Sequence, residues 1–491
     1  MSNVENCDQY STSSSNGACK NAGETTPLLL SHGSISNKAK SAPTEKKDED
    51  GTEESERRIQ LFKRRWAMLA LCCSFAYING IQNLQYAALP TSALDYYQVS
   101  AQVFDVLTLL YYLAFAVFAI PCVWFVQRTG LRPTVLCCSL LCFTGSVLAI
   151  AAAADQKLFA LAGIAQAVNG VAQVFIMSLA TKLAATWFGP SEVSTATSIL
   201  VFFYQAGSGL ALVIPPILIP ESKVMGLVRE RMLIFFGIIG SVTFVIVILV
   251  LIFFENNPPL PPSGSQFESS TREPISYKEC LKSMLKNRHF SVLVISFGLN
   301  YGAFNALETL ITPQISKNFS ELTDKTIGQI AATMVLVGTP GPLVFGIWLD
   351  KRKSYLETSS FAYLMCTFGC ALYTAAVESN WTWSLWVTLG GLGFFLSAYM
   401  SVGMEIAAEL TYPAPESTAS GLIYSSGAVF ALIEIAVMRF IMDRSSILNS
   451  NAFVTIMTLL GFILTLSIRG EMKRMQSNQN FPTDDPNTED N

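Results

Sequence analysis

The sequence predicts an all-α membrane protein with twelve transmembrane helices in two six-helix halves. First, 51% of the 491 residues are hydrophobic and 14% are charged, whereas a soluble globular chain carries about 25% charged residues. Second, twelve apolar runs are each long enough to cross a bilayer core of about 30 Å as a helix. Third, a segment with a proline-rich start and a basic end separates the sixth run from the seventh.

The expected helices fall into two sets of six. Residues 64–254 form the N-terminal half, which begins at the basic anchor Arg64-Arg65-Trp66, and residues 290–468 form the C-terminal half. Residues 255–289 join the halves as a cytosolic linker. In chain order, the spans are expected at 66–89, 104–126, 133–154, 158–180, 192–217, 232–254, 290–312, 327–349, 357–377, 383–407, 418–441 and 450–468.

Both ends of the chain are expected to be cytosolic tails, residues 1–63 and 469–491. The first is rich in Ser, Asn, Gly, Lys and Glu, and it lacks the apolar core of a cleavable signal peptide. We expect it to be disordered, because it buries too little apolar surface to offset the entropy of ordering. Within it, Glu24, Leu28 and Leu29 fit an acidic dileucine signal for clathrin adaptors, with a chance match as the alternative. The expected location is the plasma membrane, an endosome or a lysosome.

Two patterns orient the spans. Most Lys and Arg residues from Arg57 onward fall on the side that holds both tails and the linker, in line with the positive-inside rule. Two N-x-[ST] sequons, at Asn318 and Asn380, fall in loops on the other side, where glycosylation takes place. The two patterns agree on a protein with both ends in the cytosol.

The halves carry a related turn at the same place. Arg128 and Arg132 follow the second span, and Asp350 and Arg352 follow the eighth. This repeat resembles that of major facilitator superfamily transporters. In that superfamily the first of these loops usually carries an acidic residue that helps to lock the cytosolic gate; Gln127 stands there in this chain, and only Asp350 keeps the feature. The alternative is that these basic residues only obey the positive-inside rule.

Polar side chains form stripes inside several spans. Asn79, Gln82, Asn83 and Tyr86 lie at i, i+3, i+4 and i+7, so they share one face of the first helix. The seventh helix repeats the pattern. The other polar positions of the expected substrate cavity are Tyr301, Asn305 and Glu308 in the seventh helix, Gln173 in the fourth, Tyr204 and Gln205 in the fifth, and Tyr424 in the eleventh.

Two interpretations of the stripes remain open. Helices one, four, seven and ten line the central cavity in the major facilitator fold, so polar faces there suit a water-filled path for a small-molecule substrate. The same amides also serve as hydrogen-bonding contacts between packed helices. Glu308 has three possible roles: to hold a cation, to take up a coupling proton, or to lie at the water boundary. Glu405 and Glu409 end the tenth span, where a gate or a structural pair is expected.

Several functional classes find no support in the sequence. It shows no Walker P-loop and no nucleophile–base–oxyanion set, so neither ATP-driven pumping nor an enzyme is expected. With two histidines, no His-ligated metal and no cofactor are expected, and the cysteines within apolar runs are interpreted as small hydrophobes. Basic residues lie at helix ends rather than in one patch, so we expect membrane lipid and a small molecule as partners, and no nucleic acid.

Four stretches resemble the feline leukaemia virus subgroup C receptor family of transporters. They are the junction of the fourth and fifth spans at 171–195, Arg64-Arg65-Trp66, Pro215–Pro220 and Gly403–Pro413. The similarity covers about residues 64–470. It implies an organic-solute carrier, since members of that family are associated with choline and ethanolamine uptake and with haem export.

The chain departs from the choline-carrying members of that family at the site. The resemblance implies a Trp where Asn83 stands and a Tyr where Asn305 stands, two aromatics that enclose a quaternary ammonium by cation–π contact. The family glutamine on the fourth helix is kept as Gln173, and a second is replaced by Ala428. Our prediction is a transporter of a choline- or ethanolamine-like amine that works by alternating access. The alternatives are a haem transporter, a proton-coupled exporter, and a receptor or scaffold without transport.

Overall fold

The computed structural model describes residues 61–87, 89, 91–219, 222–263, 277–319, 321–379, 381–470 and 472–475. All of them belong to one compact unit, Thr52–Asn491. The predicted sorting signal at Glu24, Leu28 and Leu29 lies outside the described residues, and so does the sequon at Asn380.

Within the described residues, the first half consists of six long helices and two short elements. A short helix, α3 (Thr91–Tyr97), follows the first long helix, and one 3₁₀ turn, η1 (Gln156–Leu158), precedes α6. The long helices are α2 (Arg65–Leu84), α4 (Ala101–Thr129), α5 (Leu131–Ala154), α6 (Phe159–Trp187), α7 (Val193–Leu218) and α8 (Met225–Phe253).

The second half repeats this arrangement after a linker helix, α10 (Tyr277–Lys286). Its spans are α11 (Arg288–Asn318), the pair α12 (Asp324–Gly338) and α13 (Pro340–Arg352), α14 (Tyr355–Glu378), α15 (Thr382–Thr411), α16 (Glu416–Arg444) and α17 (Ile447–Leu466). Among the described residues, twelve helical spans are long and apolar enough to cross a membrane, which confirms the predicted fold class.

Several expected spans differ from the structure in their bounds: α6 runs to Trp187 instead of 180, α8 begins at Met225 instead of 232, and α11 runs to Asn318 instead of 312. The first and eighth spans also differ. The helix expected at 66–89 ends at Leu84, where a turn follows and the Gln85 amide donates to Gln166 of α6. The span expected at 327–349 is two consecutive helices that divide at Thr339. Pro340 causes the division, since proline has no N–H to continue a helix and is favoured at the start of the next one.

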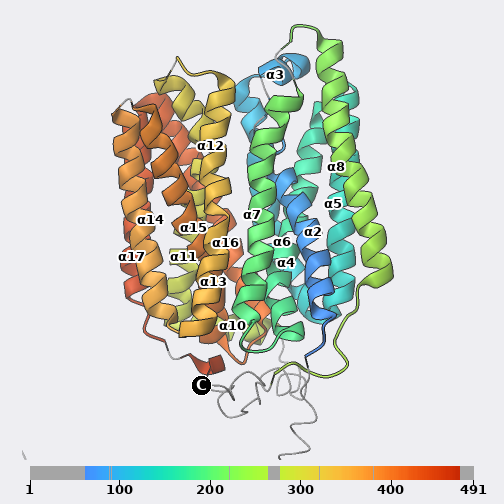
Figure 1. The fold of residues 1–491 in the computed structure, drawn as a ribbon, viewed down its shortest axis with the longest axis vertical. Coiled ribbons are helices and arrows are strands. Elements are labelled where there is room, and N and C mark those ends of the chain that lie inside the picture. The colour runs from blue at the N-terminus through green and yellow to red at the C-terminus, as the bar shows by residue number, and fades with distance from the viewer. Residues whose placement is uncertain are drawn as a thin grey trace, which may run out of the picture. The chain divides into compact units, whose positions relative to one another are not determined.

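Equivalent helices pack together in the two halves. Figure 1 shows the halves side by side, with α2 along α7 in one and α11 along α16 in the other. The contact of α2 with α7 requires glycine. A Cβ added at Gly80 would meet the backbone oxygen of Tyr204, and one added at Gly207 would meet that of Tyr77. Small residues let helix backbones approach closely in membranes, which explains both positions.

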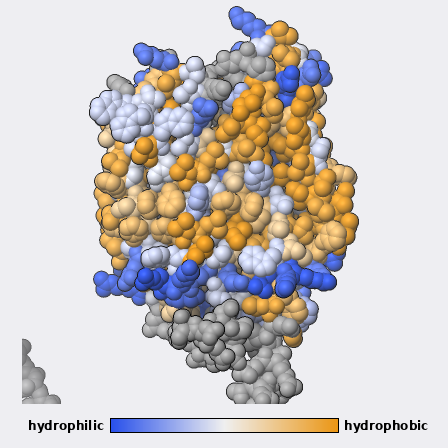
Figure 2. Space-filling view, in the orientation of Figure 1, coloured by the Kyte–Doolittle hydropathy of each residue, from blue (hydrophilic) through white to orange (hydrophobic). Residues whose placement is uncertain are grey.

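The outer surface of the helices is apolar. Ile217, Ile252 and Val387 are each at least 65% exposed, and Figure 2 shows an apolar band between hydrophilic ends. An apolar surface of this extent is not stable in water, since soluble proteins rarely expose contiguous apolar patches beyond a few hundred Å². The protein is therefore a multi-pass membrane protein.

The halves meet along two seams, where α4 and α6 pack on α16, and α7 packs on α12 and α13. We call the end of the bundle that carries α10 the linker end, and the opposite end, which carries α3, the far end (Figure 1). The candidate site lies between these seams, near the middle of the helices.

Candidate functional site

The polar stripe of α2 divides between two environments. The Asn79 amide donates to the backbone oxygen of Asn169 at 3.1 Å and accepts from the Tyr111 hydroxyl at 3.0 Å. The Gln82 amide donates to the backbone oxygen of Cys142 at 2.8 Å. All of these partners belong to the first half. These two predicted cavity residues therefore hold α2 against α4, α5 and α6 and do not reach the second half.

Tyr86, the last residue of that stripe, also lies inside the first half. Its ring packs on Phe104 of α4, with centroids 6.1 Å apart, and on Phe236 of α8 at 5.4 Å. The ring is fully buried. The structure therefore does not bring Tyr86 to the boundary between the halves.

Asn83 does face the boundary between the halves. Its amide nitrogen lies 3.4 Å from the hydroxyl of Tyr112 and 3.1 Å from that of Tyr204. The Tyr112 hydroxyl in turn donates to the side-chain oxygen of Asn305 in α11. Tyr112 thus bridges two asparagines, Asn83 of the first half and Asn305 of the second.

Gln173 makes a second bridge between the halves. Its amide nitrogen donates to the Tyr204 hydroxyl at 2.6 Å and to the Tyr301 hydroxyl at 3.1 Å. Because Tyr204 also accepts from Asn83, the two bridges form one network, which includes five predicted cavity residues and Tyr112. We call it the central network: Asn83, Tyr112, Gln173, Tyr204, Tyr301 and Asn305.

An aromatic and sulfur-containing wall borders the network in the second half. Tyr424 meets Tyr301 edge to face at 5.4 Å, and its hydroxyl donates to the sulfur of Met404 at 3.3 Å. The Gln205 amide of α7 donates to the sulfur of Met400 at 3.6 Å. Met400 and Met404 both belong to α15. The tenth span therefore contributes methionines to this region.

Glu308 lies one turn beyond Asn305 on α11. Its side chain is 3% exposed, and its place three residues after Asn305 puts both on one face of the helix. One carboxylate oxygen has no hydrogen-bond partner among the described residues. The predicted position of Glu308 in the cavity thus places a carboxylate beside the central network.

The linker end is closed by Asp350. Its carboxylate accepts from the backbone N–H groups of Ser194 and Thr195 in the first turn of α7, at 3.3 and 2.8 Å. A helix N-terminus favours a negative charge, because its first N–H groups have no partner in the helix. Nearby, the Lys353 ammonium donates to the backbone oxygen of Pro190 at 3.1 Å. Both contacts join α13 or its end to the first half.

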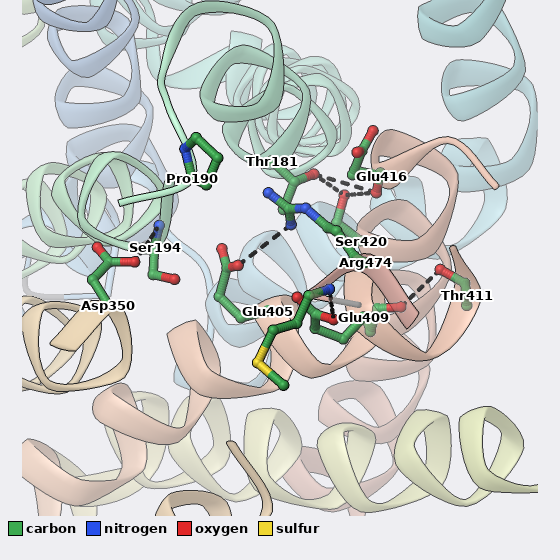
Figure 3. Close-up of polar contacts among 12 residues, drawn as sticks. Thr181, Pro190, Ser194, Asp350, Glu405, Glu409, Thr411, Glu416, Ser420 and Arg474 are labelled. Carbon is green, nitrogen blue, oxygen red and sulfur yellow. Dashed lines mark hydrogen bonds and ion pairs between the residues drawn. The ribbon is translucent and has the colours of Figure 1, made fainter. Parts of the chain in front are cut away.

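A second set of contacts at the linker end involves the chain after α17 (Figure 3). Arg474 lies 3.6 Å from Glu405, and both side chains are over 90% buried. The backbone N–H of Met475 donates to Glu409 at 3.0 Å. Burial alone would lower the pKa of Arg474, but Glu405, Glu416 and Glu409 outweigh it and raise the pKa above its usual value. The residue therefore stays charged where it is buried.

These groups border a cavity of about 220 Å³ between the halves, together with Ser194 and Tyr355. Close by, the hydroxyls of Thr181 in α6 and Ser420 in α16 share a hydrogen bond of 2.8 Å. The hydrogen bonds between the halves thus cluster at the central network and at the linker end.

The predicted basic gate residues do not take part in this closure. Arg128 lies over the ring of Trp124 at 5.4 Å, and Arg352 lies over Trp348 at 5.2 Å, the same i, i+4 pair in each half. Arg132 donates to the backbone oxygen of Leu251 at 3.2 Å. All three arginines are exposed. Asn318, the predicted glycosylation site, is exposed at the far end, where α11 ends.

Comparisons with known proteins agree with this architecture. Residues 66–433 match the model of the Major Facilitator Superfamily. The choline/ethanolamine transporter FLVCR2 of Rattus norvegicus is 34% identical over 86% of this chain and 78% of its own. The choline/ethanolamine transporter FLVCR1 of Felis catus is 31% identical over 85% of this chain and 75% of its own.

A solved structure shares the fold at low identity. The transporter FucP in its outward conformation superposes with a TM-score of 0.65 and 13% identity, over 82% of this chain and 98% of its own. At that identity the likeness concerns the arrangement of helices alone.

Proposed function

The chain belongs to the major facilitator superfamily, and from that premise we propose that it carries a small choline- or ethanolamine-like amine across a membrane by alternating access. Its relatives FLVCR1 and FLVCR2 are named choline/ethanolamine transporters. The observation that supports the proposal is the pair of hydrogen bonds from Gln173 to Tyr204 and Tyr301, since these buried polar groups lie where the two halves meet.

The contacts at the linker end fit one of the two states of such a cycle. Opening that end requires Asp350 to leave the first turn of α7 and Thr181 to separate from Ser420. The positive-inside rule assigns the linker end to the cytosol. On that assignment, the site is closed toward the cytosol in this conformation, and substrate exchanges at the far end.

Location and orientation each have a direct test. We propose that Glu24, Leu28 and Leu29 direct the protein to endosomes or lysosomes through clathrin adaptors, so Leu28→Ala with Leu29→Ala should move it to the cell surface.

Asn318→Gln and Asn380→Gln should each remove one glycan and raise the mobility of the protein on a gel. Unchanged mobility of both variants would contradict the orientation.

The function itself is tested by uptake. Cells that carry the Leu28→Ala, Leu29→Ala protein at their surface are given labelled ethanolamine, choline or haem. We expect accumulation of an amine well above that of mock-transfected cells, and little accumulation with Gln173→Met at equal surface abundance. Accumulation of haem alone would replace the amine proposal, and no transport of any of the three in either direction would favour a receptor or scaffold.

A further inference from the structure

The central site has more hydrogen-bond acceptors than donors to spare. Four oxygens have no hydrogen-bond partner among the described residues, although each side chain is at most 3% exposed. They belong to Asn83, Gln173, Gln205 and Glu308. A buried polar atom without a partner costs about 1–3 kcal/mol, so these oxygens are suited to a ligand that donates hydrogen bonds.

The amide nitrogens at the same positions are already in use. That of Asn83 donates to Tyr112 and Tyr204, and that of Gln173 donates to Tyr204 and Tyr301. The nitrogen of Gln205 reaches a methionine sulfur. The oxygens of the three amides therefore remain available to accept hydrogen bonds from a ligand.

Glu308 adds a negative charge to these acceptors. No ion pair joins it to any residue within the described ranges, and it lies one turn from Asn305 of the central network on α11. A buried carboxylate without a counter-charge is costly. A cationic ligand at this position would supply that counter-charge.

Tyr301, the second-half tyrosine whose hydroxyl meets Gln173, is poorly placed to enclose a methylated cation. Tyr301 stacks on Phe297 with an interplanar angle of 13°, and the Tyr424 ring lies perpendicular to it with centroids 5.4 Å apart. A Cβ added at Gly427 would lie 2.7 Å from the same ring. Phe297, Tyr424 and the backbone of α16 at Gly427 therefore pack against the Tyr301 ring, and its hydroxyl is the group that meets Gln173.

We propose that this acceptor set recognises a primary ammonium through its N–H groups, with Glu308 as counter-charge, so that the site prefers ethanolamine to choline. The proposal rests on the proposed amine transport. Ethanolamine brings three N–H donors and one hydroxyl, whereas the trimethylammonium of choline has no N–H to donate. Hydrogen bonds to charged groups are roughly twice as strong as neutral ones, so each lost donor weakens binding.

A methylation series tests the preference. Uptake of labelled ethanolamine is competed with ethanolamine, N-methylethanolamine, N,N-dimethylethanolamine and choline, using the full chain at the cell surface. We expect the inhibition constant to rise along the series, by about tenfold or more from first to last. Equal constants for all four would overturn the preference and leave amine transport standing. If labelled ethanolamine and choline both fail to enter, the proposed function itself fails.

Two variants test the residues. Gln205→Leu removes an acceptor that has no part in the central network, so it should raise the inhibition constant of ethanolamine and leave that of choline nearly unchanged. Glu308→Gln should raise both, because both ligands carry a positive charge. Gln82→Met, inside the first half, is the matched control. It should leave the ratio of the choline inhibition constant to the ethanolamine inhibition constant unchanged. An unaltered ratio in Gln205→Leu, or unaltered constants in Glu308→Gln, would contradict the assigned roles.

Discussion

The Tyr112 hydroxyl donates to the side-chain oxygen of Asn305 and so ties α4 of one half to α11 of the other. Its neighbour Tyr111 donates to Asn79 within the first half. Two adjacent tyrosines of one helix thus serve different purposes. One bond must rearrange when the halves move apart, and the other is kept throughout a cycle in which each half moves as a body.

Removal of each hydroxyl should therefore have a different effect. Tyr112→Phe should change the balance between the two states of the transporter by about fivefold and alter the maximal uptake rate, since about 1 kcal/mol of bond energy links the halves. Tyr111→Phe should lower the melting temperature and leave uptake per folded molecule nearly unchanged. Uptake kinetics and thermal unfolding of both variants are compared. Identical behaviour of the two would contradict the distinction.

Two glutamines offer a similar comparison. Gln173→Met removes the bonds to Tyr204 and Tyr301 and should raise the KM for the transported amine by about tenfold or more, since charge-dipole contacts near the ligand are lost. Gln82→Met removes bonds to the backbone of Cys142 and should cost about 1 kcal/mol of stability at unchanged KM. A raised KM in the Gln82 variant alone would place the site inside the first half.

The segment after α17 should help to hold the linker end closed. Arg474→Met leaves Glu405 without its ion-pair partner, which should loosen the packing of α6 on α16 near Ser420. The measurement is the labelling rate of a cysteine introduced by Ser420→Cys, which we expect to rise severalfold. Lys473→Met is the control, because Lys473 is exposed. Equal labelling in both variants would show that this segment does not hold the gate.

Close packing of α2 on α7 should not tolerate a methyl group. Gly207→Ala would press a Cβ on the backbone oxygen of Tyr77, so the variant should give less folded protein and a lower melting temperature. Gly237→Ala is the control, since a Cβ there meets nothing within 4 Å. It should be neutral or stabilising by up to about 1 kcal/mol, as alanine is the better helix former. Equal stability of the two variants would contradict the contact.

Length and hydropathy were enough to predict the twelve spans, because a bilayer imposes both on any helix that crosses it. They did not predict that α2 ends at Leu84, where Gln85 contacts Gln166 of a helix distant in sequence. Periodicity also gave the face of α2 that is polar. Periodicity could not predict which helices that polar face contacts. Consecutive residues of a helix point about 100° apart, so Gln82 contacts α5 while Asn83 faces the boundary between the halves.

Two contributors to the site carried too weak a signal in the sequence. Tyr112 lies in an apolar run of the second span, a helix that is not expected to line the cavity, so only packing reveals that its hydroxyl reaches Asn305. Arg474 belongs to the part of the chain predicted to be a tail. Arg474 reaches Glu405 because the chain after α17 folds back against the end of α15, and no local sequence pattern predicts this contact.

The central claim is that the network around Gln173 binds the amine. It is tested most directly by the thermal unfolding of the purified protein with and without ethanolamine. A ligand at 100 times its Kd stabilises the folded state by about 2.7 kcal/mol. We predict that ethanolamine raises the melting temperature of the wild type and of Gln82→Met by the same amount, and that of Gln173→Met by clearly less. An equal rise in Gln173→Met, or none in the wild type, would contradict the account.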